Sequence, residues 1–149
     1  MTQPSTTKAT ATVRATHRYD AAPERVFDAW LDPKIAGRFL FATPTGQMVK
    51  AEIDPRVGGK FNFTDRRPDM GDVEHVGAYV EIDRPRRLVF DFAVPKYDPT
   101  LTRVTIDIAP AGAGSELTLT HEGVFEEYAK QTEGGWAMIL GGLEKALAA

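Results

Sequence analysis

The feature that most constrains this chain is its last stretch, roughly residues 125–147. Apolar side chains recur there every three or four positions, which is the spacing of an amphipathic helix with one buried face. The residues on this stripe are Phe125, Tyr128, Thr132, Trp136, Ile139, Leu140, Leu143 and Leu147. Such a helix would be ~34 Å long at 1.5 Å per residue, and it needs an equally long apolar surface to lie on. Only a sheet can supply that surface, because nearly everything between Met48 and Glu122 has the pattern of strands.

The rest of the chain reads as strands with two short helices near the start. A half-buried strand begins at Thr12, where apolar and polar residues alternate. Two short helices follow, one opened by Pro23 and the other capped by Asp32 ahead of Pro33. Six further strand segments then follow at 48–54, 60–65, 73–83, 88–92, 104–108 and 117–121. Consecutive strands on short turns predict an antiparallel meander, and the segregated helices predict an α+β fold.

Length and composition indicate one domain with no charged macromolecular partner. We expect residues 1–11, which are polar and rich in threonine, to be a disordered lead-in, and residues 12–149 to form a single domain. The net charge of −3 shows no excess of positive charge, so it gives no reason to expect binding to nucleic acid or to an anionic membrane. No apolar run approaches the ~20 residues that span a bilayer, and the N-terminus lacks a signal-peptide core. These features predict a cytoplasmic protein.

The chain offers few groups for catalysis or metal binding. It has no cysteine, and its two serines lie outside any nucleophile motif, which argues against a serine hydrolase. The three histidines, His17, His75 and His121, lack the spacing of a metal site. The acidic segment 69–75 has no calcium-loop pattern and reads as a solvated hairpin tip. We therefore expect no catalytic residue, no metal and no cofactor.

A set of apolar and aromatic residues is the candidate ligand site. Most of its members would serve equally well as plain core, but a curved sheet under one helix is hard to fill, and aromatic-lined cavities suit small apolar ligands. The candidates are Trp30, Phe39, Phe61, Phe63, Tyr79, Phe90, Phe92, His121, Trp136 and Leu140. Tyr79 belongs only if its phase of the strand 73–83 faces inward, because Val76, Ala78, Val80 and Ile82 favour the other phase.

His121 and two helix glycines leave alternatives open. His121 keeps phase with inward-facing leucines, so it is either a buried histidine bonded to a carbonyl or carboxylate, or a polar anchor or acid/base at a pocket mouth. Gly135 and Gly142 lie seven apart along one edge of the helix stripe. Either the sheet approaches closely there, or the missing side chains leave room beside Trp136.

Several segments together resemble the START-like (SRPBCC) superfamily, and more narrowly its branch named after the activator of the heat-shock-protein-90 ATPase. They are DAAPERVFDAWLDP at 20–33, RVGGKFNF at 56–63, GAYVEIDRPRRLVF at 77–90, LTLTHEG at 117–123 and GGW at 134–136. The resemblance covers about 12–148 and implies a helix-grip fold, as in the birch pollen allergen. In that fold a curved seven-stranded antiparallel sheet grips the C-terminal helix, and a pocket for apolar ligands often lies between them. The sequence departs from the family at Phe39-Leu40-Phe41, where tryptophans are common.

Three functional hypotheses follow from this resemblance. The first is a binding module for a small apolar molecule between sheet and helix. The second is an enzyme similar to the polyketide cyclases and aromatases of the same fold, which would need inward acid/base groups such as His121 or Tyr79. The third is a co-chaperone that acts on heat-shock protein 90. The sequence favours binding over catalysis, and it leaves a homodimer open.

Overall fold

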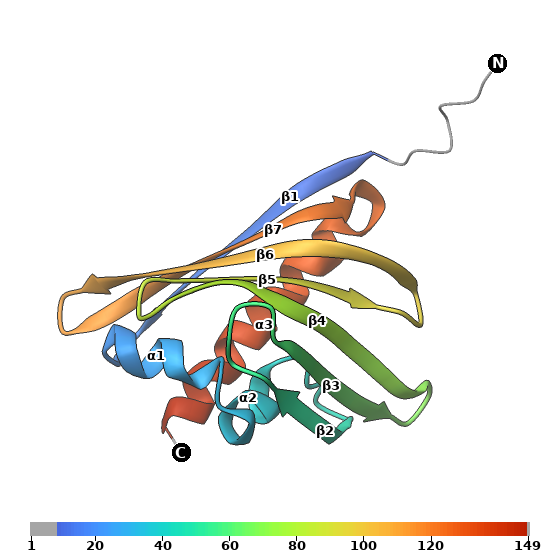
Figure 1. Cartoon of the computed structure of the whole chain (residues 1–149), viewed down its shortest axis with the longest axis horizontal. Coiled ribbons are helices and arrows are strands. Elements are labelled where there is room, and N and C mark those ends of the chain that lie inside the picture. Colours follow the sequence, from blue (N-terminus) through green and yellow to red (C-terminus); the bar gives the residue numbers. More distant parts are fainter. Residues whose placement is uncertain (1–8, 149) are drawn as a thin grey trace.

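The computed structural model describes residues 9–148 and shows the α+β helix-grip architecture expected from the sequence (Figure 1). The chain runs β1 (Thr10–Tyr19), α1 (Pro23–Ala29), α2 (Pro33–Phe39), β2 (Gln47–Ile53), β3 (Lys60–Arg67), β4 (Gly71–Asp83), β5 (Arg87–Val94), β6 (Asp98–Ala111), β7 (Gly114–Phe125), the single-turn 3-10 helix η2 (Glu126–Tyr128) and α3 (Ala129–Ala148).

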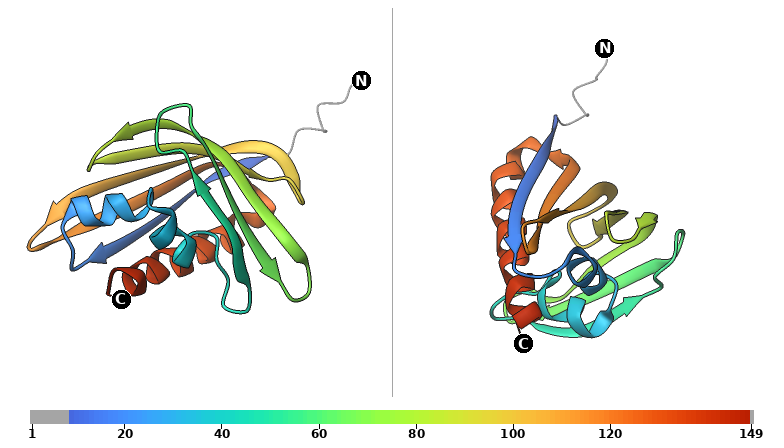
Figure 2. Two further views of the ribbon diagram at one scale, coloured as in Figure 1. Left: turned by 60° about the horizontal axis from the view of Figure 1, so that its bottom comes forward. Right: turned by 90° about the vertical axis from the view of Figure 1, so that its left-hand side faces the viewer.

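One antiparallel sheet of seven strands, in the order β1-β7-β6-β5-β4-β3-β2, makes up one layer. The meander from β2 to β7 is as predicted, and β1 closes it by pairing with β7. The sheet curves, and α3 lies along its concave side (Figure 2). Contact with α3 comes from β1 at one edge and from α2, which packs on β2, at the other. The two helices thus link the sheet's two edges without hydrogen-bonding them together.

The C-terminal helix is shorter than its apolar stripe predicts. Strand β7 continues to Phe125, which pairs with Thr10, and α3 begins only at Ala129. Tyr128 belongs to the intervening turn η2 and is 49% exposed, so it is not part of the buried face. The remainder of the stripe is correct, since the four residues of α3 that are buried all belong to it: Trp136, Leu140, Leu143 and Leu147.

Two strands differ from the sequence expectation in register or extent. β1 begins at Thr10, so the last two residues of the expected lead-in are strand, and residues 1–8 lie outside the described part of the chain. In β4 the inward phase is that of Val73, His75 and Tyr79, although the opposite phase is the more apolar one. Val80 is 38% exposed, and a register shift between Tyr79 and Glu81 ends this phase.

The two short helices begin where the prolines predict. Pro23 and Pro33 are both first-turn residues, and the Asp32 side chain accepts a hydrogen bond of 3.0 Å from the backbone N–H of Lys34. Helix α2 packs on α3 at a glycine, because a Cβ on Gly142 would lie 3.3 Å from the Cβ of Phe39. The close approach at Gly142 is therefore made to a helix and not to the sheet.

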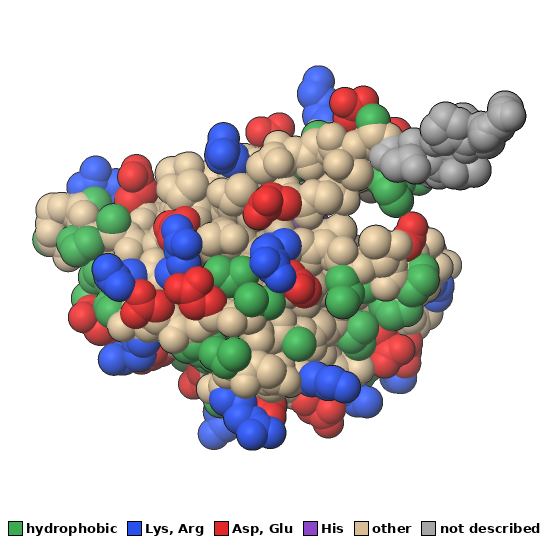
Figure 3. All heavy atoms as spheres, turned by 45° about the horizontal axis from the view of Figure 1, so that its top comes forward, with side chains coloured by type: hydrophobic (Ala, Val, Ile, Leu, Met, Phe, Trp, Pro, Cys, Tyr) green, Lys and Arg blue, Asp and Glu red, His purple; other side chains and the backbone are tan. Residues whose placement is uncertain are grey.

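The outer face of the sheet carries charges of both signs in neighbouring pairs (Figure 3). Cross-strand ion pairs account for this pattern, as Arg103 with Asp91 at 2.8 Å and Arg87 with Asp107 at 2.7 Å illustrate. The face therefore has no broad region of a single charge. Within residues 9–148 no helix is both long enough and apolar enough to cross a membrane.

Candidate ligand-binding cavity

A cavity of about 680 Å³ opens between the sheet and the first half of α3. Its walls are the β5–β6 hairpin, the end of β7, and η2 with the first three turns of α3. Phe41 and His75 reach it from the loop after α2 and from β4. Aromatic rings dominate the lining, notably those of Phe41, Phe92 and Trp136. Gly135 of α3 is part of this lining, and a Cβ built there would meet no atom within 4 Å. The two glycines of the stripe thus have different roles.

Three of the ten candidate residues line this cavity, namely Phe92, His121 and Trp136. Five others line a separate region of the core, outside this cavity, in which there is no room for a water molecule. They are Trp30, Phe61, Phe63, Tyr79 and Phe90. Phe39 packs edge-on against Trp30, with ring centroids 5.2 Å apart. Leu140 is buried, and its carbonyl accepts a 2.8 Å hydrogen bond from the hydroxyl of Tyr19. Contact between any of the ten and a ligand stays a prediction.

His121 is held by two side chains, and not by the carbonyl or carboxylate that the first of its two sequence alternatives required. The indole N–H of Trp136 can only donate, so Nδ1 of His121 accepts that hydrogen bond, which is 3.0 Å long. The proton of the neutral ring is then on Nε2, which donates to Oγ1 of Thr102 at 2.7 Å. The Thr102 hydroxyl donates in turn to the carbonyl of Phe92 at 3.4 Å.

This chain of hydrogen bonds fixes both the ring orientation and the tautomer of His121. Burial lowers the pKa of His121 from 6.5 to about 4, because the charged imidazolium would lose its hydration. Protonation would also place a second donor opposite the indole N–H of Trp136. His121 is therefore a neutral, fully hydrogen-bonded wall residue rather than a free acid or base.

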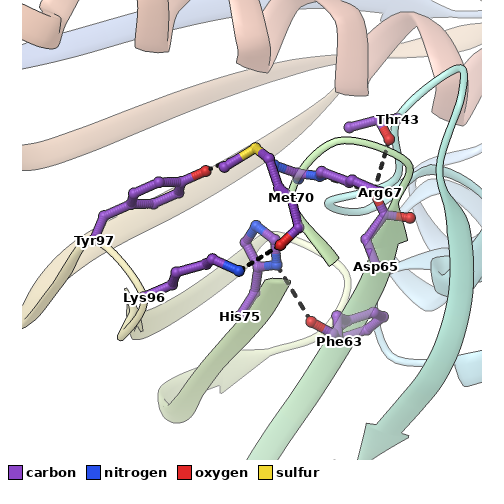
Figure 4. Close-up of polar contacts among 8 residues, drawn as sticks. All are labelled: Thr43, Phe63, Asp65, Arg67, Met70, His75, Lys96 and Tyr97. Carbon is purple, nitrogen blue, oxygen red and sulfur yellow. Dashed lines mark hydrogen bonds and ion pairs between the residues drawn. The ribbon is translucent and has the colours of Figure 1, made fainter. Parts of the chain in front are cut away.

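His75 is a wall residue that the sequence analysis did not select. Its Nδ1 lies 3.2 Å from the carbonyl oxygen of Phe63 and must donate to it, because a carbonyl only accepts (Figure 4). Nε2 then carries no proton and lies on the far side of the ring from that carbonyl. Burial lowers the pKa of His75 from 6.5 to about 4, so the ring is neutral at neutral pH. The opposite phase of β4 is the more apolar one, so the hydrophobic pattern did not place His75 on the inner face.

Phe41 is the second wall residue that sequence reasoning missed. Its ring stacks on His75 with centroids 4.3 Å apart and an interplanar angle of 12°. It also contacts Phe92 and Trp136, at 5.1 Å and 5.9 Å between centroids. Its φ of 62° is unusual for a bulky residue, and no local pattern signals it. The one available signal was that family tryptophans occur just after the second helix, where Phe41 stands.

Two hairpin tips meet beside the cavity (Figure 4). The Lys96 ammonium donates to the carbonyl of Met70 at 2.5 Å, and the Tyr97 hydroxyl donates to the sulfur of the same methionine at 3.3 Å. These contacts join the β5–β6 tip to the β3–β4 tip. Farther back, Oδ2 of Asp65 accepts from Thr43 at 2.7 Å and from Arg67 at 3.0 Å, which ties the loop before β2 to β3.

The cavity wall has little charge. Asp98 contributes a carboxylate, and no lysine or arginine from residues 9–148 lines it. Within the same residues, no group of three or more histidine, aspartate or glutamate side chains is placed to hold a metal ion. The arrangement suits an uncharged guest among aromatic rings more than it suits acid/base or metal chemistry.

The family model described as "Activator of Hsp90 ATPase homolog 1-like protein" matches residues 20–148. The chain belongs to this AHSA1-like family. The match confirms the resemblance to the START-like superfamily, and it covers both short helices, strands β2 to β7 and all of α3. No curated protein matches this AHSA1-like chain significantly.

Solved structures support the AHSA1-like fold. Protein CV1439 from Chromobacterium violaceum is 24% identical with a TM-score of 0.81, covering 93% of this chain and 97% of that one. An AHSA1-like protein from Aeromonas hydrophila is 21% identical with a TM-score of 0.80, covering 93% and 92%. SA2116 from Staphylococcus aureus, described as of unknown function, is 14% identical with a TM-score of 0.84, covering 96% of each chain. At these identities the likeness concerns the fold alone.

Proposed function

We propose that this AHSA1-like domain binds a small, largely apolar molecule in the cavity between its sheet and α3. The observation that carries the proposal is the cavity of about 680 Å³ itself. Ligand sites are typically ~300–1,000 Å³, mostly apolar and aromatic, with a few placed polar groups. Phe41, Phe92 and Trp136 supply the apolar surface, and His75 supplies a polar group.

Catalysis of a cyclisation is less well supported by the same geometry. Both ring nitrogens of His121 are engaged by Trp136 and Thr102, so it has no free position for proton transfer. Tyr79, the other acid/base candidate, lies in the closed core. Burial raises its pKa well above the usual range, which keeps its hydroxyl protonated. Binding is the function that these residues favour.

Native mass spectrometry of freshly purified protein, followed by a thermal-shift screen of apolar compounds, tests binding. A ligand that binds only the folded state raises the melting temperature by mass action. Gly135→Leu fills the cavity from α3, whereas Gly134→Leu, at a solvent-exposed helix position with equal free space, is the matched control. We expect Gly135→Leu to abolish the ligand response and Gly134→Leu to keep it. No response to any compound, or an undiminished response in Gly135→Leu, contradicts the proposal.

The family description also supports the hypothesis that the domain is a co-chaperone. Its test is a pulldown with purified heat-shock protein 90, together with a measurement of the ATPase rate. Stimulation of that ATPase by wild type and by Gly135→Leu alike would assign the domain a role that does not depend on the cavity.

A further inference from the structure

The cavity contains a hydrogen-bond acceptor that the protein leaves unused. His75 is 6% exposed, and its Nδ1–H is committed to the carbonyl of Phe63. Nε2 therefore carries the lone pair of the neutral ring, and no donor among residues 9–148 is hydrogen-bonded to it; the ring's other backbone contact, to Val73, is with an acceptor. Because His75 lines the cavity, this lone pair is available to a guest. Nε2 is not one of the fully buried unpaired atoms, so water or a guest can reach it from the cavity. A guest that displaces water there without supplying a donor loses that hydrogen bond, whereas a guest with a donor keeps it.

His121 does not compete for that role, although it lines the same cavity. Its Nδ1 already accepts from Trp136, and its Nε2–H already donates to Thr102. The two histidines consequently carry their protons on opposite ring nitrogens. Only His75 presents an acceptor, and neither ring presents a free donor.

The charge of the wall restricts the guest further. No lysine or arginine from the described residues lines the cavity, and both histidines are neutral at neutral pH. A carboxylate or phosphate bound there would lose its hydration without gaining a cation, which is strongly unfavourable. Anionic lipids such as fatty acids are therefore poor candidates.

The shape of the aromatic surface favours a flat guest. Phe41 lies parallel to His75, and its ring centroid is within 6 Å of those of Phe92 and Trp136. Rings at such separations pack by stacking and by edge-to-face contact, and a planar guest can extend both arrangements.

We propose that the ligand of this cavity is an uncharged, planar aromatic molecule whose hydroxyl group donates a hydrogen bond to Nε2 of His75. This inference rests on the proposed function and deepens it. His75 and the stacked Phe41 then determine which class of ligand binds. Truly apolar hydrocarbons, methyl ethers and carboxylates of the same ring system are predicted to bind less well.

Three probes with one ring system separate these features: hydroxypyrene, methoxypyrene and pyrene carboxylate. Each is titrated into wild-type protein at neutral pH, and binding is followed by probe fluorescence and by quenching of tryptophan emission. One charge-neutral hydrogen bond with its desolvation is worth about 1.4 kcal/mol, or a factor of ~10 in affinity. We expect hydroxypyrene to bind ~10-fold more tightly than methoxypyrene, and pyrene carboxylate to bind weakest.

His75→Phe keeps a ring beside Phe41 but removes the acceptor. We expect it to reduce hydroxypyrene affinity ~10-fold while leaving methoxypyrene affinity unchanged. His17→Phe is the control, because His17 is hydrogen-bonded to Glu144 and does not line the cavity, so the ratio of affinities should stay as in wild type. In wild type, long-range proton–nitrogen correlation spectra should show Nε2 of His75 unprotonated, with its resonance moving on addition of hydroxypyrene. That measurement needs no variant to fold.

The outcomes distinguish this inference from the function on which it rests. Equal affinities for hydroxypyrene and methoxypyrene, with no change at Nε2, would overturn the role of His75 while leaving a binding cavity. Tightest binding of the carboxylate would overturn the uncharged class. Failure of all three probes, together with no ligand response in the wider screen, would overturn the proposed function itself.

Discussion

Replacing Trp136 with phenylalanine tests the hydrogen-bond chain that holds the cavity wall. Trp136 is 3% exposed, and its indole N–H is the donor to Nδ1 of His121. Phenylalanine keeps an aromatic ring in the same place but deletes that donor. A hydrogen bond contributes a net ~0.5–1.5 kcal/mol, and a buried acceptor left without a partner costs a further ~1–3 kcal/mol.

The orphaned Nδ1 would border a cavity, so water can reach it, and values in the lower half of both ranges apply. We therefore expect Trp136→Phe to lower the free energy of unfolding by about 2 kcal/mol. For a domain of this size, that corresponds to a fall of ~4–8 °C in melting temperature. Urea denaturation measures the change, with Trp30 as the remaining fluorophore.

A natural control is Trp30→Phe, because Trp30 is buried but its N–H has no partner within residues 9–148. Its loss of packing is offset by the removal of an unpaired buried donor, so its net effect should be smaller. A double-mutant cycle of Trp136→Phe with His121→Leu isolates the bond itself. We expect a coupling energy of about 1 kcal/mol. A coupling indistinguishable from zero would refute the assigned tautomer and the chain of bonds built on it.

Three further predictions concern pH, the helix glycines and β1. Burial lowers the pKa of both cavity histidines from 6.5 to about 4, so stability is full above pH 6.5. It should fall by about 1.4 kcal/mol per pH unit per histidine as urea titrations approach pH 4. Gly134→Ala, with open space around it, should stabilise by ~1 kcal/mol, whereas Gly142→Ala, crowded by Phe39, should gain nothing or lose stability in thermal melts. Deleting residues 1–11 removes the pairing of Thr10 with Phe125 and should lower the melting temperature, which an unchanged melt would contradict.

Periodicity predicted the architecture because each element has one buried face. The stripe around Trp136 and Leu140 defined α3, and alternation defined the strands on which it lies. The start of α3 was wrong because Phe125 and Tyr128 continue the helical spacing by coincidence. Phe125 ends a strand, and Tyr128 lies in a turn. Spacing alone cannot separate a helix from a strand end followed by a turn of similar pitch.

The candidate site was predicted only in part, because a cavity forms where side chains from different elements leave space between them. Phe92 and Phe90 share a face of one strand, yet the first lines the cavity and the second lies in closed core. Which of them has an empty neighbour depends on contacts across elements distant in sequence. Phe41 depends on a backbone conformation that its residue type disfavours, and His75 depends on a strand phase that hydrophobicity argued against.

The absence of a side chain at Gly135 has a consequence for how such domains can diversify. The sheet holds together through its own ladders, and α3 is anchored elsewhere, by Leu140, Leu143 and Leu147 and by the contact of Gly142 with α2. A Cβ at position 135 would meet no atom within 4 Å, so a side chain there can extend into the cavity and away from these contacts. The cavity volume can therefore change at position 135 without altering the contacts of Leu140, Leu143 or Gly142. A single substitution at position 135 could then change which molecules fit, and a designer could alter the volume of the cavity from α3 alone.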